Sequence, residues 1–256
     1  MRGWSTVNAP DWLTARPIAH RGLHDRAAGI PENTLAAAEA AIAGGYAIEC
    51  DVQPSADGEA MVFHDEALGR LTGTPHAIAS RTASELSTLS VSGSRERIPT
   101  LPAFLDGIAG RTPLIVEVKT QFTGDMTLVN RVAEVVAGYE GPVALKSFDP
   151  RIVWMLGSLA PERPRGIVAE TSQDEISYAK LPSSVRHGLA NLLHLNETKP
   201  DFLSWRVDDL PAGPPYLCRL LGRMPVMAWT VRTDDQRRNA KANADQIVFE
   251  GFRPLI

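Results

Sequence analysis

Eight short apolar segments, separated by stretches with helical spacing, follow one another along this chain and restrict its possible folds. The predicted strands are Pro17–His20, Tyr46–Gln53, Pro113–Lys119, Val143–Ser147, Gly166–Glu170, Asp201–Trp205, Val226–Val231 and Gln246–Phe249. The predicted helices between them include Thr34–Ala43, Leu101–Ala109, Met126–Ala137, Arg151–Leu159, Glu175–Leu195 with a break at Pro182, and Asp234–Ala242. Each connection is long enough to join parallel strands. In a chain of 256 residues, this pattern predicts an α/β protein with a (β/α)8 barrel, the TIM-barrel fold.

An open, doubly wound sheet is the other fold with this alternation of strands and helices. Such a sheet is often marked by GxGxxG or GxxxxGK[ST] after its first strand, and neither pattern follows Pro17–His20. No low-complexity linker divides the chain, so we predict a single domain over residues 1–256. The widest gap between predicted strands lies between Phe63 and Pro113, which predicts a short insertion after the second strand region, over roughly residues 65–112.

Composition and charge exclude several classes of protein. Hydrophobic residues make up 44% of the chain and charged residues 22%, so a disordered chain is excluded. The net charge of −4 offers no broad attraction to nucleic acid or to anionic lipid. Cys50 and Cys218 form neither a disulfide framework nor a CxxC motif. Residues 1–13 lack the apolar run of a signal peptide, and no run approaches the length of a membrane span, so we expect a cytoplasmic protein.

Charged residues alternate with apolar ones on two of the predicted strands. In the second strand Glu49, Asp51 and Gln53 share one face, and in the third strand Glu117 and Lys119 share one face. A barrel strand packs its outer face against helices, so the apolar sets should face outward. The charged sets should then point into the barrel near the carboxyl ends of the strands, where active sites of this fold occur.

Neighbouring carboxylates on a buried face repel one another and are costly to remove from water. Glu49, Asp51 and Glu117 would offer three oxygen ligands, which favours a hard divalent cation, Mg²⁺ or Ca²⁺. Zinc is disfavoured because no cluster of Cys and His ligands accompanies them. The alternative is a salt-bridge network in which Arg21 and Lys119 neutralise the carboxylates without a metal.

Two histidines follow apolar segments near these acids. His20 ends the first predicted strand, and His64 follows the apolar run that closes with Phe63. Imidazole titrates near neutrality, so one ring can accept a proton while the other donates one. Arg21 and Lys119 are suited to contact a phosphate, because fixed positive charge offsets the charge that develops on its oxygens.

Further candidates carry weaker signals. Trp229 shares a strand face with Met227 and either lines the barrel mouth or packs in the core. Lys146 is either a phosphate-binding residue or a solvated strand end. Asp65 is placed to orient the His64 ring, and Asn33 or Thr34 could cap the following helix.

Motifs in a fixed order resemble the glycerophosphodiester phosphodiesterase family. They are His20-Arg21-Gly22, Pro31-Glu32-Asn33-Thr34, Glu49-Cys50-Asp51-Val52, Asp57-Gly58, His64-Asp65, Leu68-Gly69-Arg70-Leu71-Thr72-Gly73 and Glu117-Val118-Lys119. Trp229-Thr230-Val231 also matches the seventh strand of this family. The resemblance covers most of the chain.

The resemblance implies a TIM-barrel enzyme of glycerol and lipid metabolism, a phosphoric diester hydrolase that converts glycerophosphodiesters to glycerol 3-phosphate and an alcohol. It implies attack by the neighbouring glycerol hydroxyl, a cyclic phosphate intermediate and its hydrolysis. The implied roles are acid-base catalysis by His20 and His64, metal binding by Glu49, Asp51 and Glu117, and substrate binding by Arg21, Lys119 and Trp229.

The chain departs from the family pattern at the end of the barrel sequence. Arg232 follows Val231 where the family usually has Asn, and Phe249-Glu250 stands where it has a Thr-Asp-Tyr-Pro-like turn. These changes bear on substrate choice, in particular on the alcohol or head group that is released. One alternative is a phospholipase D-like enzyme acting on lysophospholipids or sphingolipids, although we expect no exposed apolar loop or aromatic cluster for a lipid interface. A second alternative is a non-catalytic barrel that binds phosphorylated ligands.

Overall fold

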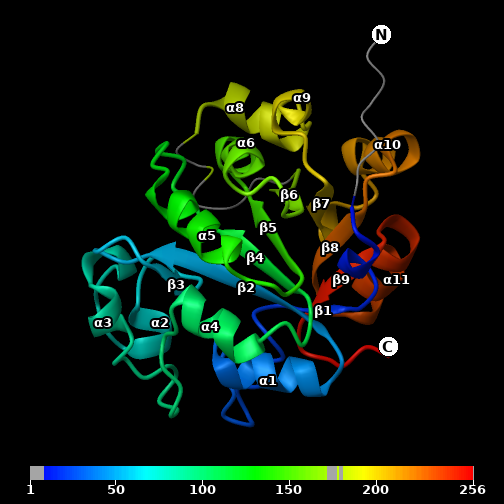
Figure 1. Cartoon of the computed structure of the whole chain (residues 1–256). Helices are drawn as coiled ribbons and strands as arrows, with labels where there is room; N and C mark the ends of the chain where they lie inside the picture. The colour runs from blue at the N-terminus through cyan, green and yellow to red at the C-terminus, as the bar shows by residue number, and fades with distance from the viewer. Residues whose placement is uncertain (1–8, 172–177, 179–180, 256) are drawn as a thin grey trace. The chain divides into compact units, whose positions relative to one another are not determined.

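The computed structural model describes residues 9–171, 178 and 181–255. The chain divides into two compact units, each formed from separate stretches of sequence (Figure 1). The N-terminal unit comprises Ile18–Lys119 and Asp125–Val143. The C-terminal unit comprises Thr120–Gly124, Ala144–Leu255 and the described residues up to Pro17.

The N-terminal unit is built on three parallel strands, with β2 between β1 and β4. The strands are β1 (Ile18–Ala19), β2 (Ala47–Pro54), β4 (Leu114–Val118) and the antiparallel β3 (Ala60–Val62), which pairs with the end of β2. The helices α1 (Leu35–Ala43) and α4 (Leu101–Ile108) contact one another, and α5 (Thr127–Ala137) follows β4 (Figure 1). In the register of β2 and β4, Asp51 lies opposite Glu117.

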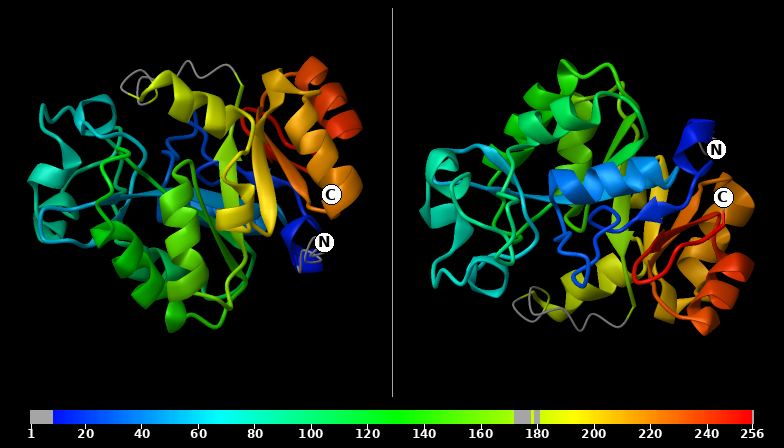
Figure 2. Two further views of the ribbon diagram at one scale, coloured as in Figure 1. Left: turned by 90° about the horizontal axis from the view of Figure 1, so that it is seen from above. Right: turned by 90° about the horizontal axis from the view of Figure 1, so that it is seen from below.

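Short helices fill the segment between β3 and α4, where the sequence predicts an insertion. They are α2 (Gly69–Thr72), the 3-10 helix Ile78–Ser80 and α3 (Ala83–Leu86), and they lie together at one end of the N-terminal unit (Figures 1 and 2). The segment has a hydrophobic core shared with β3 and the residues that follow it: Met61, Phe63, Leu68, Leu71, Ile78, Leu86, Val91 and Ile98. This core fixes the segment through apolar burial, and the end of the segment also pairs with β3, where Val62 N–H donates to the Pro99 carbonyl at 2.8 Å.

The C-terminal unit has five parallel strands in the order β5-β6-β7-β8-β9. They are β5 (Val143–Ser147), β6 (Arg165–Ala169), β7 (Phe202–Arg206), β8 (Val226–Val231) and β9 (Gln246–Phe249). The helices are α6 (Pro150–Leu159), α8 (Ser183–Ala190), α9 (Leu195–Thr198), α10 (Gly213–Gly222) and α11 (Asp234–Asn243). A core around Trp205, Val226 and Ala228 joins β7 and β8 to the helices that cover them.

Within the described residues, eight parallel strands alternate with helices, so the predicted (β/α)8 fold is confirmed. The predicted helix Glu175–Leu195 is described only in part. Its described part holds α8, which begins after Pro182, while residues 175–177 and 179–180 lie outside the described residues. Helix α10 was not predicted, because its Gly213-Pro214-Pro215 start resembles a loop, although proline is well tolerated in a first helical turn.

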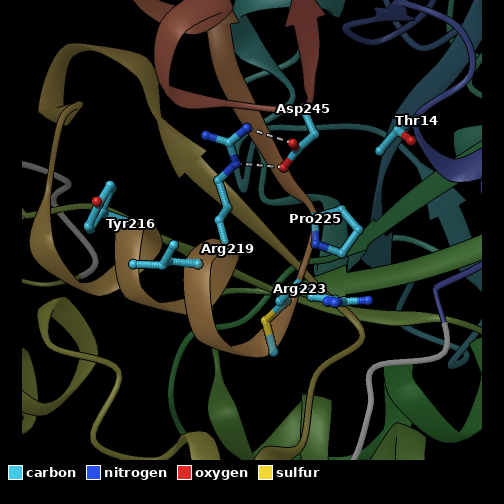
Figure 3. Close-up of a pocket in the computed structure, with 8 residues that line it drawn as sticks. Thr14, Tyr216, Arg219, Arg223, Pro225 and Asp245 are labelled. Carbon is cyan, nitrogen blue, oxygen red and sulfur yellow. Dashed lines mark hydrogen bonds and ion pairs between the residues drawn. The ribbon is translucent and has the colours of Figure 1, made fainter.

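Helix α10 presents an apolar face to solvent, although the sequence indicated no exposed apolar loop for a lipid interface. Tyr216, Leu217, Leu220 and Leu221 are 51 to 66% exposed. Beside it lies an open hollow of about 510 Å³, in which Arg219 donates two hydrogen bonds to Asp245 (Figure 3). No helix in the described part of the chain is both long enough and apolar enough to cross a membrane.

Candidate active site

Three carboxylates of the N-terminal unit come together as the strand pattern predicts. Glu49 and Asp51 lie on β2 and Glu117 lies on β4, and each is less than 5% exposed. One oxygen from each residue lies within 4.8 Å of the others. The cause is the pairing of Asp51 with Glu117 in the parallel register, together with the two-residue period that puts Glu49 on the same face.

Two cations lie against this group of acids, as the alternative salt-bridge prediction requires. The Lys119 Nζ atom lies 2.8 Å from Asp51 Oδ1 and 2.6 Å from Glu117 Oε1. The Arg21 Nε atom lies 3.2 Å from Asp51 Oδ2. Burial disfavours the charged form of Lys119, but Asp51 and Glu117 outweigh it and raise the pKa of the ammonium. Lys119 and Arg21 therefore place positive charge directly against these carboxylates.

Asp51 is the electrostatic centre of the group. Burial alone would raise its pKa, but the charge of Lys119, followed by those of His64, Arg21 and His20, holds the pKa of Asp51 well below its usual value. Both histidines are thus close enough to Asp51 to act on its ionisation. The four predicted residues His20, Arg21, His64 and Lys119 are brought together around one carboxylate.

The His64 ring is oriented by its neighbour, as predicted. Its Nδ1 atom lies 2.7 Å from Asp65 Oδ1. Burial disfavours the ionised form of Asp65, but hydrogen bonds with His64 and Arg70 lower its pKa. An ionised carboxylate only accepts hydrogen bonds, so the proton of a neutral His64 ring is on Nδ1, and Nε2 is left to accept another. Gln53, on the face of β2 that carries Asp51, donates to the His64 carbonyl at 2.9 Å.

Asn33 contributes to the site in a way the sequence did not indicate. Its side chain donates to Asp51 Oδ2 at 3.1 Å and accepts from the Asp51 backbone N–H at 3.2 Å. Of the two residues proposed as helix caps, only Thr34 caps α1, where its hydroxyl accepts from Ala37 N. Asn33 has a φ of 55°, a left-handed conformation that asparagine adopts more readily than most residues.

A left-handed turn after β1 positions His20 and Arg21. Arg21 and Gly22 have φ values of 57° and 77°. The turn directs the Arg21 backbone N–H to Glu49 Oε2 at 3.2 Å. A Cβ atom at Gly22 would lie 2.8 Å from the backbone carbon of Ala37 in α1, so the turn requires glycine for both its conformation and its packing.

The other candidates lie in the C-terminal unit. Trp229, on β8, donates from Nε1 to the Ser204 carbonyl at 2.8 Å and packs edge-on against Phe148 with ring centroids 5.6 Å apart. Phe148 in turn contacts Tyr178, so Trp229 belongs to an aromatic cluster that was not expected. Lys146 is 3% exposed, which rules out a solvated strand end. The substrate-binding role of Trp229 stays a prediction.

Two residues that depart from the family pattern contact each other. The Arg232 Nη2 atom donates to Glu250 Oε2 at 2.8 Å. The substitutions at these two positions thus form one exposed ion pair after β8 and β9.

Comparisons with known proteins agree on one family. A family model described as the glycerophosphoryl diester phosphodiesterase family matches residues 20–250. A glycerophosphodiester phosphodiesterase of Caldanaerobacter subterraneus subsp. tengcongensis is 28% identical over 250 residues, which are 93% of this chain and 95% of that protein. The matched range of the family model includes all the candidate site residues, from His20 to Trp229.

Solved structures show the same fold. A phosphodiesterase from Oleispira antarctica, in complex with the product sn-glycerol-3-phosphate, superimposes with a TM-score of 0.74 at 24% identity and covers 91% of both chains. A glycerophosphodiester phosphodiesterase from Agrobacterium tumefaciens gives a TM-score of 0.65 at 27% identity, over 91% of this chain and 94% of that one.

The turn after β1 can be tested with two matched glycine substitutions. Gly22 and Gly29 have similar φ values of 77° and 72°, but a Cβ at Gly29 has no atom within 4 Å. Gly29→Ala should lower the free energy of unfolding by about 1–2 kcal/mol through the left-handed conformation alone. Gly22→Ala should cost roughly 1–3 kcal/mol more, because of its clash with Ala37. Urea denaturation measures both, and equal losses would contradict the packing argument.

Proposed function

The chain belongs to the glycerophosphoryl diester phosphodiesterase family, and we propose that it hydrolyses glycerophosphodiesters to glycerol 3-phosphate and an alcohol by means of His20 and His64. The observation that carries this proposal is the convergence of Glu49, Asp51 and Glu117 within 4.8 Å, with both histidines acting on Asp51. Family membership makes the chain a phosphoric diester hydrolase, which disfavours the non-catalytic alternative.

The acidic residues fit a divalent cation. Glu49, Asp51 and Glu117 supply oxygen ligands, the type that Mg²⁺ and Ca²⁺ prefer, and one oxygen of each lies within 4.8 Å of the others. A cation held there would polarise the phosphoryl oxygens and lower the pKa of the attacking hydroxyl. The Lys119 ammonium lies against two of these acids and reduces their mutual repulsion.

The histidines divide the proton transfers between them. In the first step, one imidazole accepts the proton of the glycerol hydroxyl next to the phosphate, and the hydroxyl oxygen bonds to phosphorus. The other imidazolium donates a proton to the departing alcohol oxygen as its bond to phosphorus breaks. In the second step the roles are exchanged. One imidazole takes a proton from water as the water oxygen bonds to phosphorus, and the other imidazolium gives a proton to the ring oxygen as its bond to phosphorus breaks. Asp65 supports this exchange by keeping the Nε2 atom of His64 available.

Arg21 and Lys119 are suited to hold the phosphate. An ammonium has three N–H donors, of which two in Lys119 are directed to Asp51 and Glu117, so one is left for a phosphate oxygen. Arg21 donates from Nη1 to Glu32 and retains further donors on its guanidinium, and its Nε lies 3.2 Å from Asp51 Oδ2 without a hydrogen bond. Both cations are fixed by their carboxylate partners before substrate binds, which reduces the entropy lost on binding.

One observation favours the second candidate function, a phospholipase D-like activity on lysophospholipids or sphingolipids. The exposed leucines of α10 form an apolar surface of the kind that an enzyme acting at a lipid interface requires. Rates on glycerophosphocholine and on micellar lysophosphatidylcholine separate the two functions, and we expect the soluble diester to be the faster substrate.

Removal of either histidine should abolish most of the activity. His20→Ala and His64→Ala should each lower kcat by at least ~100-fold, because a general acid or base is lost. The assay is the release of glycerol 3-phosphate from glycerophosphocholine, -ethanolamine, -glycerol and -inositol. His187→Ala, at an exposed position on α8, is the control and should leave kcat unchanged. Near-normal kcat in both histidine variants would refute the acid-base assignment.

Hydrolysis should depend on a divalent cation held by Glu49, Asp51 and Glu117. EDTA should abolish hydrolysis, and Mg²⁺ or Ca²⁺ should restore it. By calorimetry, Asp51→Asn and Glu117→Gln should lose binding of the cation, because each removes a charged ligand. Glu39→Gln is the control, since Glu39 is exposed and pairs with Arg111. Full activity in metal-free protein, or unaltered cation affinity in the two variants, would contradict the metal site.

A further inference from the structure

A continuous series of ion pairs runs from His64 to Arg21. Its first half joins His64 to Arg70 through Asp65. Asp65 Oδ1 lies 2.7 Å from His64 Nδ1, and Arg70 donates from Nε to Asp65 Oδ2 at 2.6 Å and from Nη2 to Asp65 Oδ1 at 3.0 Å. The Asp65 carboxylate is therefore held by two parallel hydrogen bonds from one guanidinium, an arrangement that fixes its plane.

The second half joins Arg70 to Arg21 through Glu32. Arg70 donates from Nη1 to Glu32 Oε2 at 2.9 Å and from Nη2 to Glu32 Oε1 at 2.7 Å. Glu32 Oε1 also accepts from Arg21 Nη1 at 2.6 Å, and the Nε atom of Arg21 lies 3.2 Å from Asp51. One guanidinium thus links the acid-base histidine with the cation placed for the phosphate.

The carboxylates in this series are more buried than Arg70 itself. The Arg70 side chain is 47% exposed, whereas those of Asp65 and Glu32 are 21% and 13% exposed. Burial disfavours the charged form of Glu32, but hydrogen bonds from Arg70 and Arg21 lower its pKa to about 2. The two carboxylates thus stay ionised and accept hydrogen bonds from both of their neighbours.

The short helices after β3 hold Arg70 in place. Arg70 lies on α2, where the adjacent Leu71 is buried in the core of that segment. The helix ends at Gly73, whose φ of 71° closes the turn with a hydrogen bond to the Gly69 carbonyl. Leu68 at the start of α2 is fully buried and its N–H donates to the His76 carbonyl at 2.9 Å. Arg70 is thus supported from both ends of α2.

We propose that Arg70 is a positioning residue for this reaction, which fixes His64 through Asp65 and Arg21 through Glu32 in one arrangement. This inference rests on the proposed function of His64 and Arg21. It assigns a catalytic purpose to the segment between β3 and α4, whose core is shared with Met61 of β3. In this role Arg70 acts through the orientation of His64 and Arg21. Reaction rates are sensitive to small displacements of the groups that contact substrate.

An exposed ion pair that positions no catalytic group would contribute almost nothing to the rate. The value of kcat in Arg70 variants therefore distinguishes a positioning role from an ordinary surface ion pair. Arg70→Met should lower kcat at least ~10-fold, because both carboxylates lose the fork that orients them. Arg70→Lys keeps the positive charge and should fold as the parent protein does, but it should still lose most of this rate, since an ammonium cannot make two bidentate pairs. Arg111→Met is the matched control, because Arg111 makes an exposed bidentate pair with Glu39 and should keep its kcat.

A spectroscopic measurement separates positioning from a general loss of structure. The proton on His64 Nδ1 should give a downfield NMR signal in the parent protein, because it is shared with an ionised carboxylate at 2.7 Å. The signal is assigned by its absence in His64→Ala. It should broaden or disappear in Arg70→Met while the urea midpoint of unfolding stays close to that of Arg111→Met.

The outcomes also separate this inference from the proposed function. If His64→Ala is inactive but Arg70→Met and Arg70→Lys keep kcat within about threefold and retain the downfield signal, the inference on Arg70 is wrong and the catalytic assignment stands. If His64→Ala retains full activity, the proposed function itself is wrong. If Arg70→Met does not fold, full activity in Arg70→Lys overturns the positioning role.

Discussion

The repulsion among three buried carboxylates is the constraint on which the rest of the site depends. Glu49, Asp51 and Glu117 are almost completely removed from solvent, within 4.8 Å of one another. Ions in such surroundings are stable only when opposite charge or hydrogen-bond donors face them. Lys119 and Arg21 supply such charge, and a divalent cation would add more.

The same repulsion explains why two left-handed backbone conformations bring hydrogen-bond donors to the acids of β2. The left-handed turn at Gly22 brings the Arg21 backbone N–H to Glu49, and the left-handed Asn33 brings an amide to Asp51. The left-handed conformations of Arg21 and Asn33 are uncommon for residues other than glycine, and each brings a donor to a buried anion. Glu32, next to Asn33, starts the series of ion pairs that ends at His64. The acids, the Arg21 guanidinium and the His64 ring thus form one electrostatic unit.

Much of this site followed from sequence because strand geometry has a period of two. That period placed Glu49 and Asp51 on one face, and the alternation of elements gave the parallel pairing with Glu117. Contacts between loops have no such period. Glu32 and Arg70 lie 38 positions apart in the sequence, and they meet because the core around Leu71 holds α2 in place. No local sequence pattern predicts this ion pair.

Local rules also failed where tertiary contacts compete with them. Asn33 has the side chain of a helix cap, yet it leaves the cap to Thr34, because its Oδ1 accepts from the Asp51 backbone N–H and its Nδ2 donates to the Asp51 carboxylate. Helix α10 was missed because its prolines resemble a loop, and its exposed leucines were therefore not recognised as a surface.

The most direct test of the central claim is anomalous diffraction from crystals of the protein grown with Mn²⁺. The account predicts a single strong peak in contact with an oxygen of each of Glu49, Asp51 and Glu117, at distances of about 2.0–2.3 Å. It also predicts that the Lys119 ammonium stays paired with at least one of the acids. A site that remains without a peak at saturating Mn²⁺, with Lys119 alone bridging Asp51 and Glu117, would contradict it.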